Sequence, residues 1–570
     1  MILHIFTIPG IDLYYNTWAT SLTALLESAI RSFFSNFWIY QTRYRNIFVK
    51  NINMDHLTTI GTCVASYLLY KRIHSTCSIN PYNGSDSSRR LLLLANLSIE
   101  ILQRVRTIYH GPIIHSLTFD KLEVIQECLL CVDANGKICA LVDVTAAAAA
   151  TAATASTAAT TAATISPTKL QQLEKIATAI EWITLGTKFL CPGFVDAHAH
   201  APQHAFTGTG MDLPLLEWLQ RYTFPHESKF SNLDHARNIY DNAVRSHLRN
   251  GSTTVSYFAT IHTDACKVLV DVVRDRGQRA LVGKVNMDRN APDFYIETTE
   301  GSLRDTQTFV NYVLNLHDPL VTPVITPRFV PTCTPTLMKG LGVIAKKHNL
   351  PIQSHMGETL EEYAWVRSLH PESTTYTDVY RNHGLLPSDG TVYMAHCIHC
   401  GSGERESMLK YGCGVVHCPN SNFTLGSGIC NVQQWVGEGH VVGLGTDVAG
   451  GYSPSMLDAI RNARIASVAV TQVSGKQNSK VVQDFRLSFS QLFYLATLGG
   501  ARVVGMGNVI GNFEVGKDLD ALVVDPEAIG SPMTVYKHDD LLDRFQKFLF
   551  LGDDRNIIQV IVKGDICKTK

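Results

Sequence analysis

Two histidines separated by one residue lie near the middle of the chain, in the run PGFVDAHAHAPQHAFTG that spans residues 192–208. The apolar residues before them predict a buried strand, and in a strand side chains two positions apart point to the same side. His198 and His200 therefore face one side together, and imidazole nitrogens are good metal ligands. His204 comes after the predicted end of the strand, so we expect it to take no part in the site.

Further polar residues of metal-binding or catalytic type end other short apolar runs. They are Arg328 in TPRF, His355 in QSHMGE, His396 in MAHC and Asp447 in GTDVAGG. One histidine at a strand end is more often structural than a ligand, but several at one rim favour a metal site. Imidazoles and a carboxylate suit zinc, which lowers the pKa of a bound water to about 7. The predicted zinc ligands are His198, His200, His355 and Asp447.

Glu358 follows His355 by three residues, where the predicted strand turns into a helix. A carboxyl group in this position can share the pocket and move protons without binding the metal. The alternative is a carboxylate that stabilises the N-terminus of the helix through its dipole. Beside a predicted metal ligand, we favour the proton-shuttle role.

Eight short apolar runs that alternate with helical stretches lie between residues 187 and 500. This alternation predicts an α/β fold with a (β/α)8 TIM-type barrel, in which the C-terminal ends of the strands carry the active site. The barrel would therefore bring the polar residues at the ends of these runs together. The expected strands are residues 189–200, 252–258, 280–287, 321–329, 350–355, 391–397, 414–420 and 441–447.

Short β-rich runs flank the barrel region on both sides. Residues 106–186 contain several of them, with a hairpin-turn signal at Asn135 and Gly136, and residues 501–570 return to the same pattern. We expect the two segments to form one small flanking β-sandwich domain. Residues 145–164 are a low-complexity tract of alanine and threonine, which we expect to be an exposed insert. Residues 1–105 form an N-terminal extension of unknown role.

The composition excludes several classes of protein. With 45% hydrophobic and 17% charged residues, the chain of 570 residues is typical of a folded globular protein. Its formal net charge of -1 predicts no nucleic-acid partner and no membrane partner. Fourteen scattered cysteines favour buried thiols in a reducing compartment, so we expect a cytoplasmic protein. Cys397 and Cys400 have the spacing of half a zinc knuckle, but no second pair completes it.

The ordered motifs PGFVDAHAH, SHMGE, AHC and GTDVAGG resemble those of the amidohydrolase superfamily of metal-dependent hydrolases. Within that superfamily the chain is similar to the guanine deaminase family. The motifs that carry this similarity are HAPQ (200–203), DLPLLEWLQRYTFP (212–225), TPRF (326–329), HCPNSN (417–422) and GTDVAGGYSPSMLDAIR (445–461). An HxH pair alone is weak evidence, whereas this ordered set, from about residue 109 to the C-terminus, is specific.

The resemblance implies hydrolytic removal of the exocyclic amine of guanine, which gives xanthine and ammonia. It implies one zinc ion per chain, held by the four predicted ligands, with Asp447 also accepting a proton from the attacking water. Glu358 would protonate the ring nitrogen beside the attacked carbon, and His396 would position the water or the intermediate. The implied catalytic residues are thus Glu358, Asp447 and His396.

The resemblance also implies that Gln203, Arg328 and Phe329 bind the substrate. Gln203 offers donors and an acceptor, and Arg328 offers donors only, which suits a base with a carbonyl oxygen and mixed polar edges. Phe329 can pack against the flat ring. The expected partners are guanine and water as small molecules and, because family members are commonly homodimers, a second copy of the chain.

The chain departs from the family pattern at Gly357, where serine is usual, and in the run after His396, but no predicted ligand is lost. An aminohydrolase acting on another aminated heterocycle and a non-catalytic scaffold that retains the barrel remain alternatives. A binuclear cyclic-amide hydrolase is less favoured because the run ending in PRF supplies no bridging lysine. A cytidine-deaminase-like fold is excluded because its Pro-Cys-x-x-Cys zinc motif is missing.

Overall fold

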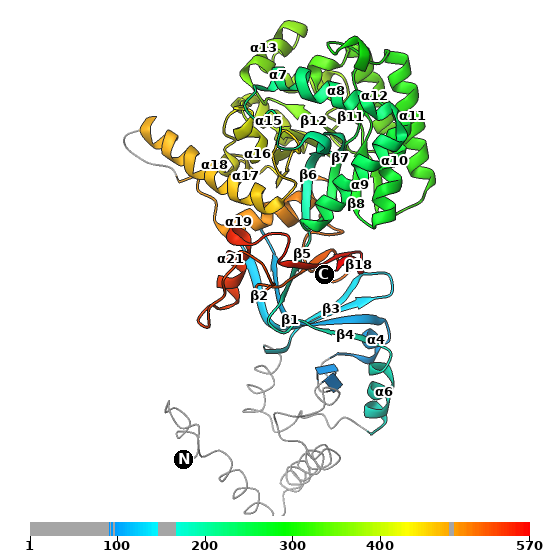
Figure 1. Ribbon diagram of the computed structural model, residues 1–570, viewed down its shortest axis with the longest axis vertical. Coiled ribbons are helices and arrows are strands. Elements are labelled where there is room, and N and C mark those ends of the chain that lie inside the picture. The colour runs from blue at the N-terminus through cyan, green and yellow to red at the C-terminus, as the bar shows by residue number, and fades with distance from the viewer. Residues whose placement is uncertain (1–89, 92, 95–96, 146–166, 478–483, 570) are drawn as a thin grey trace, which may run out of the picture. The chain divides into compact units, whose positions relative to one another are not determined.

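The structure is a computed structural model (Figure 1), and it describes residues 90, 91, 93, 94, 97–145, 167–477 and 484–569. Most of the predicted N-terminal extension and all but one residue of the Ala/Thr tract lie outside these residues. Residues 91–153 and 167–570 form one compact unit.

Parallel strands form the centre of the predicted barrel region. They are β6 (Phe194–His200), β7 (Ser252–Phe258), β8 (Arg279–Gly283), β9 (Val285–Asn286), β10 (Val321–Pro323), β11 (Thr326–Pro327), β12 (Ile352–Met356), β13 (Val392–His396), β14 (Gly414–His417) and β15 (Val442–Leu444). Their hydrogen-bonded orders are β6-β7-β8-β10, β9-β11 and β12-β13-β14-β15. Two of the predicted strands are each divided in two, into β8 with β9 and into β10 with β11.

The backbone connects these groups of strands in a cyclic order. A parallel bridge between Ile325 and Ile352 links the segment before β11 to β12. The segment after β15 returns to β6, because the Asp447 N–H donates to the His198 carbonyl over 2.9 Å. The His200 N–H also donates to the Val448 carbonyl over 2.9 Å. The eight predicted strand units therefore follow one another in chain order.

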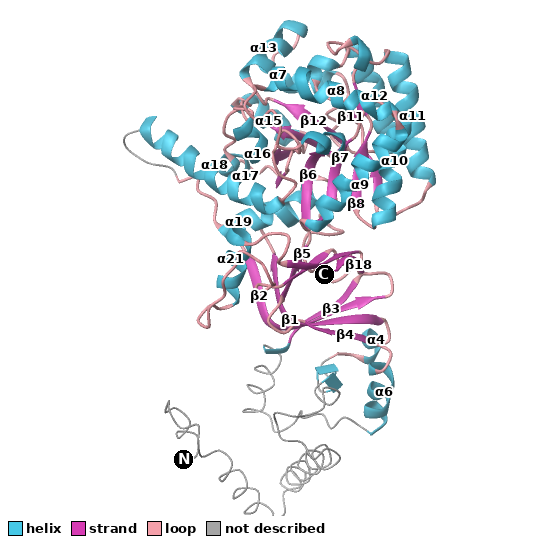
Figure 2. Cartoon of the chain, viewed as in Figure 1, coloured by secondary structure: helices cyan, strands magenta, loops and turns pink. Residues whose placement is uncertain are grey.

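Helices alternate with the strands and lie around them, as Figure 2 shows in cyan. An apolar stripe explains this packing on α9, where Ala236, Tyr240 and Val244 are four residues apart and are all buried. The helices of this region are α7 (Leu215–Trp218), α8 (Phe224–Glu227), α9 (Leu233–Arg249), α10 (Thr263–Arg276), α11 (Thr299–Asn315), α12 (Pro335–His348), α13 (Leu360–Leu369), α14 (Tyr376–Asn382), α15 (Ser402–Lys410), α16 (Pro419–Thr424), α17 (Val432–Gly437), α18 (Met456–Gln477), α19 (Phe489–Tyr494) and α20 (Gly500–Val503).

A second sheet contains segments from before and after the barrel region. Its order is β18-β17-β16-β5-β1-β2-β3, and β4 also pairs with β1. The predicted turn at Asn135 and Gly136 lies between two antiparallel strands of this sheet. The strands are β1 (Val105–Ser116), β2 (Leu122–Asp133), β3 (Ile138–Asp143), β4 (Glu181–Thr184), β5 (Phe189–Pro192), β16 (Ala521–Val524), β17 (Ile557–Val562) and β18 (Asp565–Thr569), and the helices along these segments are α4 (Ile99–Leu102), α6 (Pro167–Ala177) and α21 (Leu541–Leu551).

The predicted strand 189–200 is in fact two strands in two sheets. β5 pairs with β1 and β16, whereas β6 pairs with β7. The break falls at Gly193, where a side-chain Cβ would lie only 2.2 Å from atoms of Thr253. The apolar pattern runs across this break because both strands are buried, so periodicity alone did not reveal it.

A buried ion-pair cluster joins the beginning of β8 to the segment that leads into β16. Arg279 is 2% exposed, and its Nε donates to Asp520 Oδ2 over 2.9 Å. Its Nη2 donates to Asp518 Oδ2 over 2.9 Å and to Asp520 Oδ1 over 3.1 Å. Both partners are buried, so this cluster connects the parallel strands to the second sheet.

Two further sequence expectations concern the cysteines and the membrane. The twelve cysteines in the described part of the chain are free thiols, and ten of them are buried, as expected. Within the same residues, no helix has both the length and the apolar character needed to cross a bilayer.

Candidate active site

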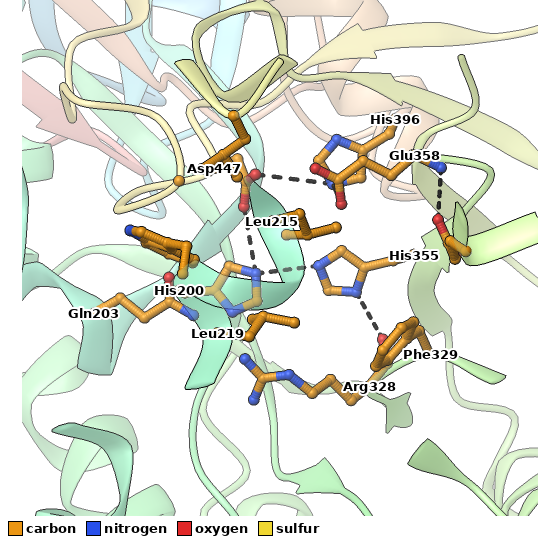
Figure 3. A pocket seen from close by; sticks show the side chains of 14 residues that line it. His200, Gln203, Leu215, Leu219, Arg328, Phe329, His355, Glu358, His396 and Asp447 are labelled. Carbon is orange, nitrogen blue, oxygen red and sulfur yellow. Dashed lines mark hydrogen bonds and ion pairs between the residues drawn. The ribbon is translucent and has the colours of Figure 1, made fainter. Parts of the chain in front are cut away.

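The residues predicted to form the site lie at the C-terminal ends of the parallel strands, and Figure 3 shows most of them around one pocket. His204 lies beyond the end of β6, as expected, and does not line the pocket. Gln203 comes one residue before it and does. The other positions are His198 and His200 in β6, Arg328 and Phe329 directly after β11, His355 in β12, Glu358 after β12, His396 at the end of β13 and Asp447 after β15.

The four predicted metal ligands bring their donor atoms together. His198 Nε2 and His200 Nε2 lie 3.2 and 3.3 Å from the same oxygen, Asp447 Oδ1. His200 Nε2 is also 3.2 Å from His355 Nε2. Ligand bonds of about 2.0–2.2 Å place neighbouring donors roughly 3–3.5 Å apart around a zinc ion. The observed separations therefore match those of atoms that share one metal ion.

His396 offers a fifth donor near the same group. Within the described residues, one possible metal-binding group places its ligand atoms within 4.8 Å of one another, and it consists of His198, His355, His396 and Asp447. His396 Nε2 is 3.8 Å from Asp447 Oδ2 and 3.4 Å from Glu358 Oε2. Two overlapping ligand sets are therefore possible. Both contain His198, His355 and Asp447, and the fourth ligand is His200 in one set and His396 in the other. The shorter contacts of His200 favour the set that contains it.

The imidazoles of His198, His200 and His355 are neutral, because burial lowers their pKa values. Burial lowers the pKa of His200 to about 4, and burial also lowers the pKa of His198. His355 Nδ1–H donates to the Arg328 carbonyl over 2.6 Å, which leaves its Nε2 lone pair toward the other ligands. His198 Nε2 and His396 Nε2 are buried and make no well-formed hydrogen bond to the protein. These features suit the binding of a cation.

Asp447 supplies the negative charge of the group. Burial opposes its ionisation, but the neighbouring nitrogens of His198 and His200 hold its pKa well below the usual value. Its backbone has a φ of 49°, and that of His396 has a φ of 71°. Residues other than glycine rarely adopt this left-handed region, and such conformations are concentrated at functional sites.

Glu358 lies beside the donor group and is prepared to hold a proton. Burial, together with the carboxylate of Asp447, raises its pKa to about 8. The Ser427 hydroxyl donates to Glu358 Oε1 over 2.9 Å, and the Glu358 backbone N–H donates to Glu362 Oε2 over 2.8 Å. The carboxyl group of Glu358 is therefore fixed in position and carries a proton near neutral pH.

Gly357 explains one of the departures from the family pattern. Its φ is 62°, and a Cβ at this position would lie 2.8 Å from the ring of Tyr363. Its carbonyl accepts hydrogen bonds from the backbone N–H groups of Ile398 and His399. Glycine adopts this conformation without strain, so the tight turn between His355 and Glu358 is accommodated by the residue that stands there.

The predicted substrate-binding residues line the same pocket as the donor group. Every predicted site residue except His198 lines it. Phe329 is 7% exposed and packs edge-to-face against Trp365, with ring centroids 6.1 Å apart. The remaining lining residues, which the sequence did not predict, are mostly apolar: Leu215, Trp218, Leu219, Glu362, Leu425 and Gly450.

A buried carboxylate that the sequence did not predict holds the polar side of this pocket. Glu227 Oε2 and Oε1 accept from Arg328 Nη1 and Nη2 over 2.7 and 3.1 Å. Glu227 Oε1 also accepts from Gln203 Nε2 over 2.9 Å, and Glu227 Oε2 from the Tyr295 hydroxyl over 2.8 Å. Burial opposes ionisation of Glu227, but the Arg328 guanidinium holds its pKa below the usual value.

Sequence reasoning also missed the residues that orient the predicted catalytic side chains. Asn422 Oδ1 accepts from His396 Nδ1 over 3.0 Å, Ser427 donates to Glu358, and Glu362 accepts from the Glu358 backbone. Asn422 belongs to the HCPNSN run that carried the family resemblance, so a signal for it existed. Glu227, Glu362 and Ser427 stand in no motif that distinguishes them from surface residues.

Comparison with known proteins agrees with this geometry. The model of the amidohydrolase family matches residues 189–567. The guanine deaminase of Dictyostelium discoideum is 41% identical over 475 residues, which are 82% of this chain and 99% of that protein. The guanine deaminase of Mus musculus is 43% identical over 463 residues, which are 80% of this chain and 95% of that protein.

A solved structure is similar over the same region. The crystal structure of guanine deaminase from C. acetobutylicum with guanine bound in its active site aligns with a TM-score of 0.69 at 36% identity. The alignment covers 81% of this chain and 99% of that one. The family model matches more than half of the chain, and the relatives are matched over nearly their full length. The chain therefore belongs to the amidohydrolase family.

Proposed function

We propose that this enzyme hydrolyses guanine to xanthine and ammonia. The observation that carries the proposal is that a His/Asp donor group, the carboxyl group of Glu358 and a donor pair for the base, Arg328 and Gln203, line one pocket. The guanine deaminases that share 41 to 43% identity with the chain support the same reaction. Attack by water on the carbon that bears the amine, followed by loss of ammonia, balances as guanine plus water giving xanthine plus ammonia.

We propose zinc as the metal, one ion per chain. Members of the family are typically metal-dependent, and three neutral imidazoles with one carboxylate suit zinc. His198, His200, His355 and Asp447 would hold the ion, and His396 would remain free for the substrate. When bound, the ion would lower the pKa of a coordinated water to about 7 and so supply a nucleophile at neutral pH.

The protein residues would move the protons of the reaction. Asp447 accepts a proton from the attacking water, and its low pKa keeps it ionised for this step. Glu358 gives its proton to the ring nitrogen beside the attacked carbon, which its raised pKa allows. His396 Nε2 lies between the two carboxyl groups, at 3.4 Å from Glu358 and 3.8 Å from Asp447, where it can hold the water or the developing alcohol.

The other half of the pocket would orient the base. The 6-oxygen and N7 of guanine are acceptors, and the guanidinium of Arg328 has five N–H donors, of which Glu227 uses two. Gln203 can read a mixed donor and acceptor edge. Phe329 and the apolar side chains of Leu215 and Leu219 cover the ring.

The test is to assay ammonia release from guanine, adenine and cytosine separately, with metal content measured on the same samples. We expect turnover of guanine. Glu358→Ala should keep its metal and its fold and lose nearly all activity, because the ring nitrogen then lacks its acid. Glu361→Ala removes an exposed carboxylate from the same helix start and should be as active as the unaltered protein. Release from adenine or cytosine but not guanine would overturn the proposal.

The amidohydrolase family has a TIM-type barrel fold, and we also propose which residues of this chain form the barrel and which form the domain beside it. Residues 106–186 and 501–570 form the small flanking β-sandwich, and residues 187–500 form the barrel. The pairing of β5 with β1 and β16 supports a small domain built from both segments, but it puts residues 189–192 in that domain, so the barrel begins after residue 192. A homodimer and a cytoplasmic location remain predictions, which gel filtration with light scattering and cell fractionation would test.

A further inference from the structure

Glu227 is the centre of the hydrogen bonds on the base-binding side of the pocket. It ends the short helix α8 and is completely buried. Its two oxygens accept four hydrogen bonds, two from Arg328 and one each from Gln203 and Tyr295. It does not itself line the pocket, whereas Arg328 and Gln203 do. Any hydrogen-bonded effect of Glu227 on a ligand must therefore pass through these two side chains.

The bonds to Glu227 fix the orientation of both side chains. Gln203 donates from Nε2 to Glu227, while its Oε1 accepts from the Ala449 N–H over 3.2 Å. Both ends of the amide are thus assigned, and the amide cannot rotate by half a turn without losing both bonds. Two hydrogen bonds hold the fork of Arg328 on the carboxylate, and its Cζ lies 5.3 Å from the centre of the Phe224 ring.

Glu227 also balances the charge of the pocket. The guanidinium of Arg328 is buried and always positive. Without a carboxylate it would attract an anion, whereas the pair has no net charge and offers only its directed N–H groups to a ligand. An uncharged base with a carbonyl oxygen fits such a pair better than an anionic base does.

We propose that Glu227 is a positioning and specificity-determining residue, which presents Arg328 and Gln203 to the acceptor edge of an uncharged oxopurine and selects against anionic purines. This inference rests on the proposed turnover of guanine. It assigns to Glu227 no contact with the substrate and no proton transfer. Loss of Glu227 should change substrate binding and the selectivity for uncharged over anionic ligands. It should leave metal binding and the role of Glu358 unchanged.

The experiment compares Glu227→Gln with the unaltered enzyme, using guanine as substrate and urate, a monoanion at neutral pH, as competing ligand. The amide keeps the size of the side chain but faces Arg328 and Gln203 with donors of its own. We expect kcat/KM for guanine to fall roughly 100-fold, mainly through KM, with metal content unchanged. Inhibition by urate should become stronger relative to guanine binding, because the charge of Arg328 is no longer balanced.

Glu297→Gln is the control, because Glu297 is a partly buried glutamate that pairs with a buried cation, Lys284, over 2.5 Å and lies outside the pocket. It should lose stability like Glu227→Gln but keep the KM for guanine. If Glu227→Gln does not fold, Glu227→Asp, which retracts the carboxylate by one methylene, should raise KM about 10-fold.

An unchanged KM in a folded Glu227 variant would overturn the inference, as would equal weakening of guanine and urate. These outcomes concern Glu227 alone. Absence of guanine turnover by the unaltered, metal-loaded enzyme would instead overturn the proposed function.

Discussion

Two arginines of this chain are buried to the same extent and bound to carboxylates, yet they lie at opposite ends of the parallel strands. Arg279 is the first residue of β8, and its three hydrogen bonds all go to Asp518 and Asp520. Arg328 directly follows β11, pairs with Glu227 through two hydrogen bonds and lines the pocket. The two guanidinium groups are chemically identical and differ in what surrounds them.

The comparison shows how position along a strand separates stability from function. At the amino end, the ion pairs join the barrel strands to the second sheet, and the partner carboxylates are fixed by further contacts, such as that of Asp520 with the Lys563 N–H at 2.8 Å. At the carboxyl end, the same kind of pair holds a side chain toward a cavity. A perturbation at the amino end should therefore lower the free energy of unfolding, and one at the carboxyl end should lower turnover.

Among residues at the carboxyl ends of the strands, we expect replacement of the histidines to cause the largest loss of activity. His200→Ala should lose both the metal and more than 1,000-fold in activity, because it removes a ligand of the proposed set. His396→Ala should lose comparable activity but retain the metal. Metal analysis and guanine turnover on both variants check this. The reverse pattern of metal loss would assign the fourth ligand to His396.

Arg328→Lys should come next, with a fall in kcat/KM for guanine of roughly 100-fold. Lysine keeps the charge but cannot form the fork to Glu227 and present further N–H groups in the same plane. Steady-state kinetics and a thermal unfolding scan on the same sample measure both properties. A loss of stability with unchanged kinetics would mean that the two arginines have the same role.

Arg279→Lys is the matched substitution at the amino end. It should lower the free energy of unfolding by about 1–3 kcal/mol, because one ammonium group cannot replace three directed hydrogen bonds to two buried aspartates. The kcat/KM for guanine at a temperature where the variant is folded should stay within about twofold. A large loss of turnover would show that the amino end of the strands is coupled to the site.

The smallest effect is a shift in pH dependence on the carboxyl-end side. Glu358 must be protonated to act as an acid, so activity should fall as the pH rises through its pKa. Burial and the carboxylate of Asp447 raise this pKa to about 8. The charge of a bound metal ion would lower it. The Ser427 hydroxyl stabilises the carboxylate form, so Ser427→Ala should move the alkaline limb of kcat/KM upward by about 0.5–1 pH unit. A downward shift would contradict the role of Glu358 as acid.

The sequence was sufficient to find those site residues whose position follows from a strand. His355 and His396 lie at the ends of short apolar runs that predict strands. The order of these strands in the predicted barrel then brings the two side chains together. Glu227 was missed because it lies on a short helix and its partners are 24, 68 and 101 residues away along the chain. The division of residues 189–200 into two strands was missed for a related reason, since it depends on the close approach of Thr253 to Gly193.

The hydrogen bond from His355 Nδ1–H to the carbonyl of Arg328 has an evolutionary consequence. Residue 328 orients a ligand of the proposed metal group with its main chain and, in the proposed function, would bind the substrate with its side chain. Because every amino acid carries the same carbonyl, a mutation at this position can alter which base is accepted without removing the acceptor that orients His355. A new substrate preference can thus arise in one step while the hydrolytic centre is inherited intact.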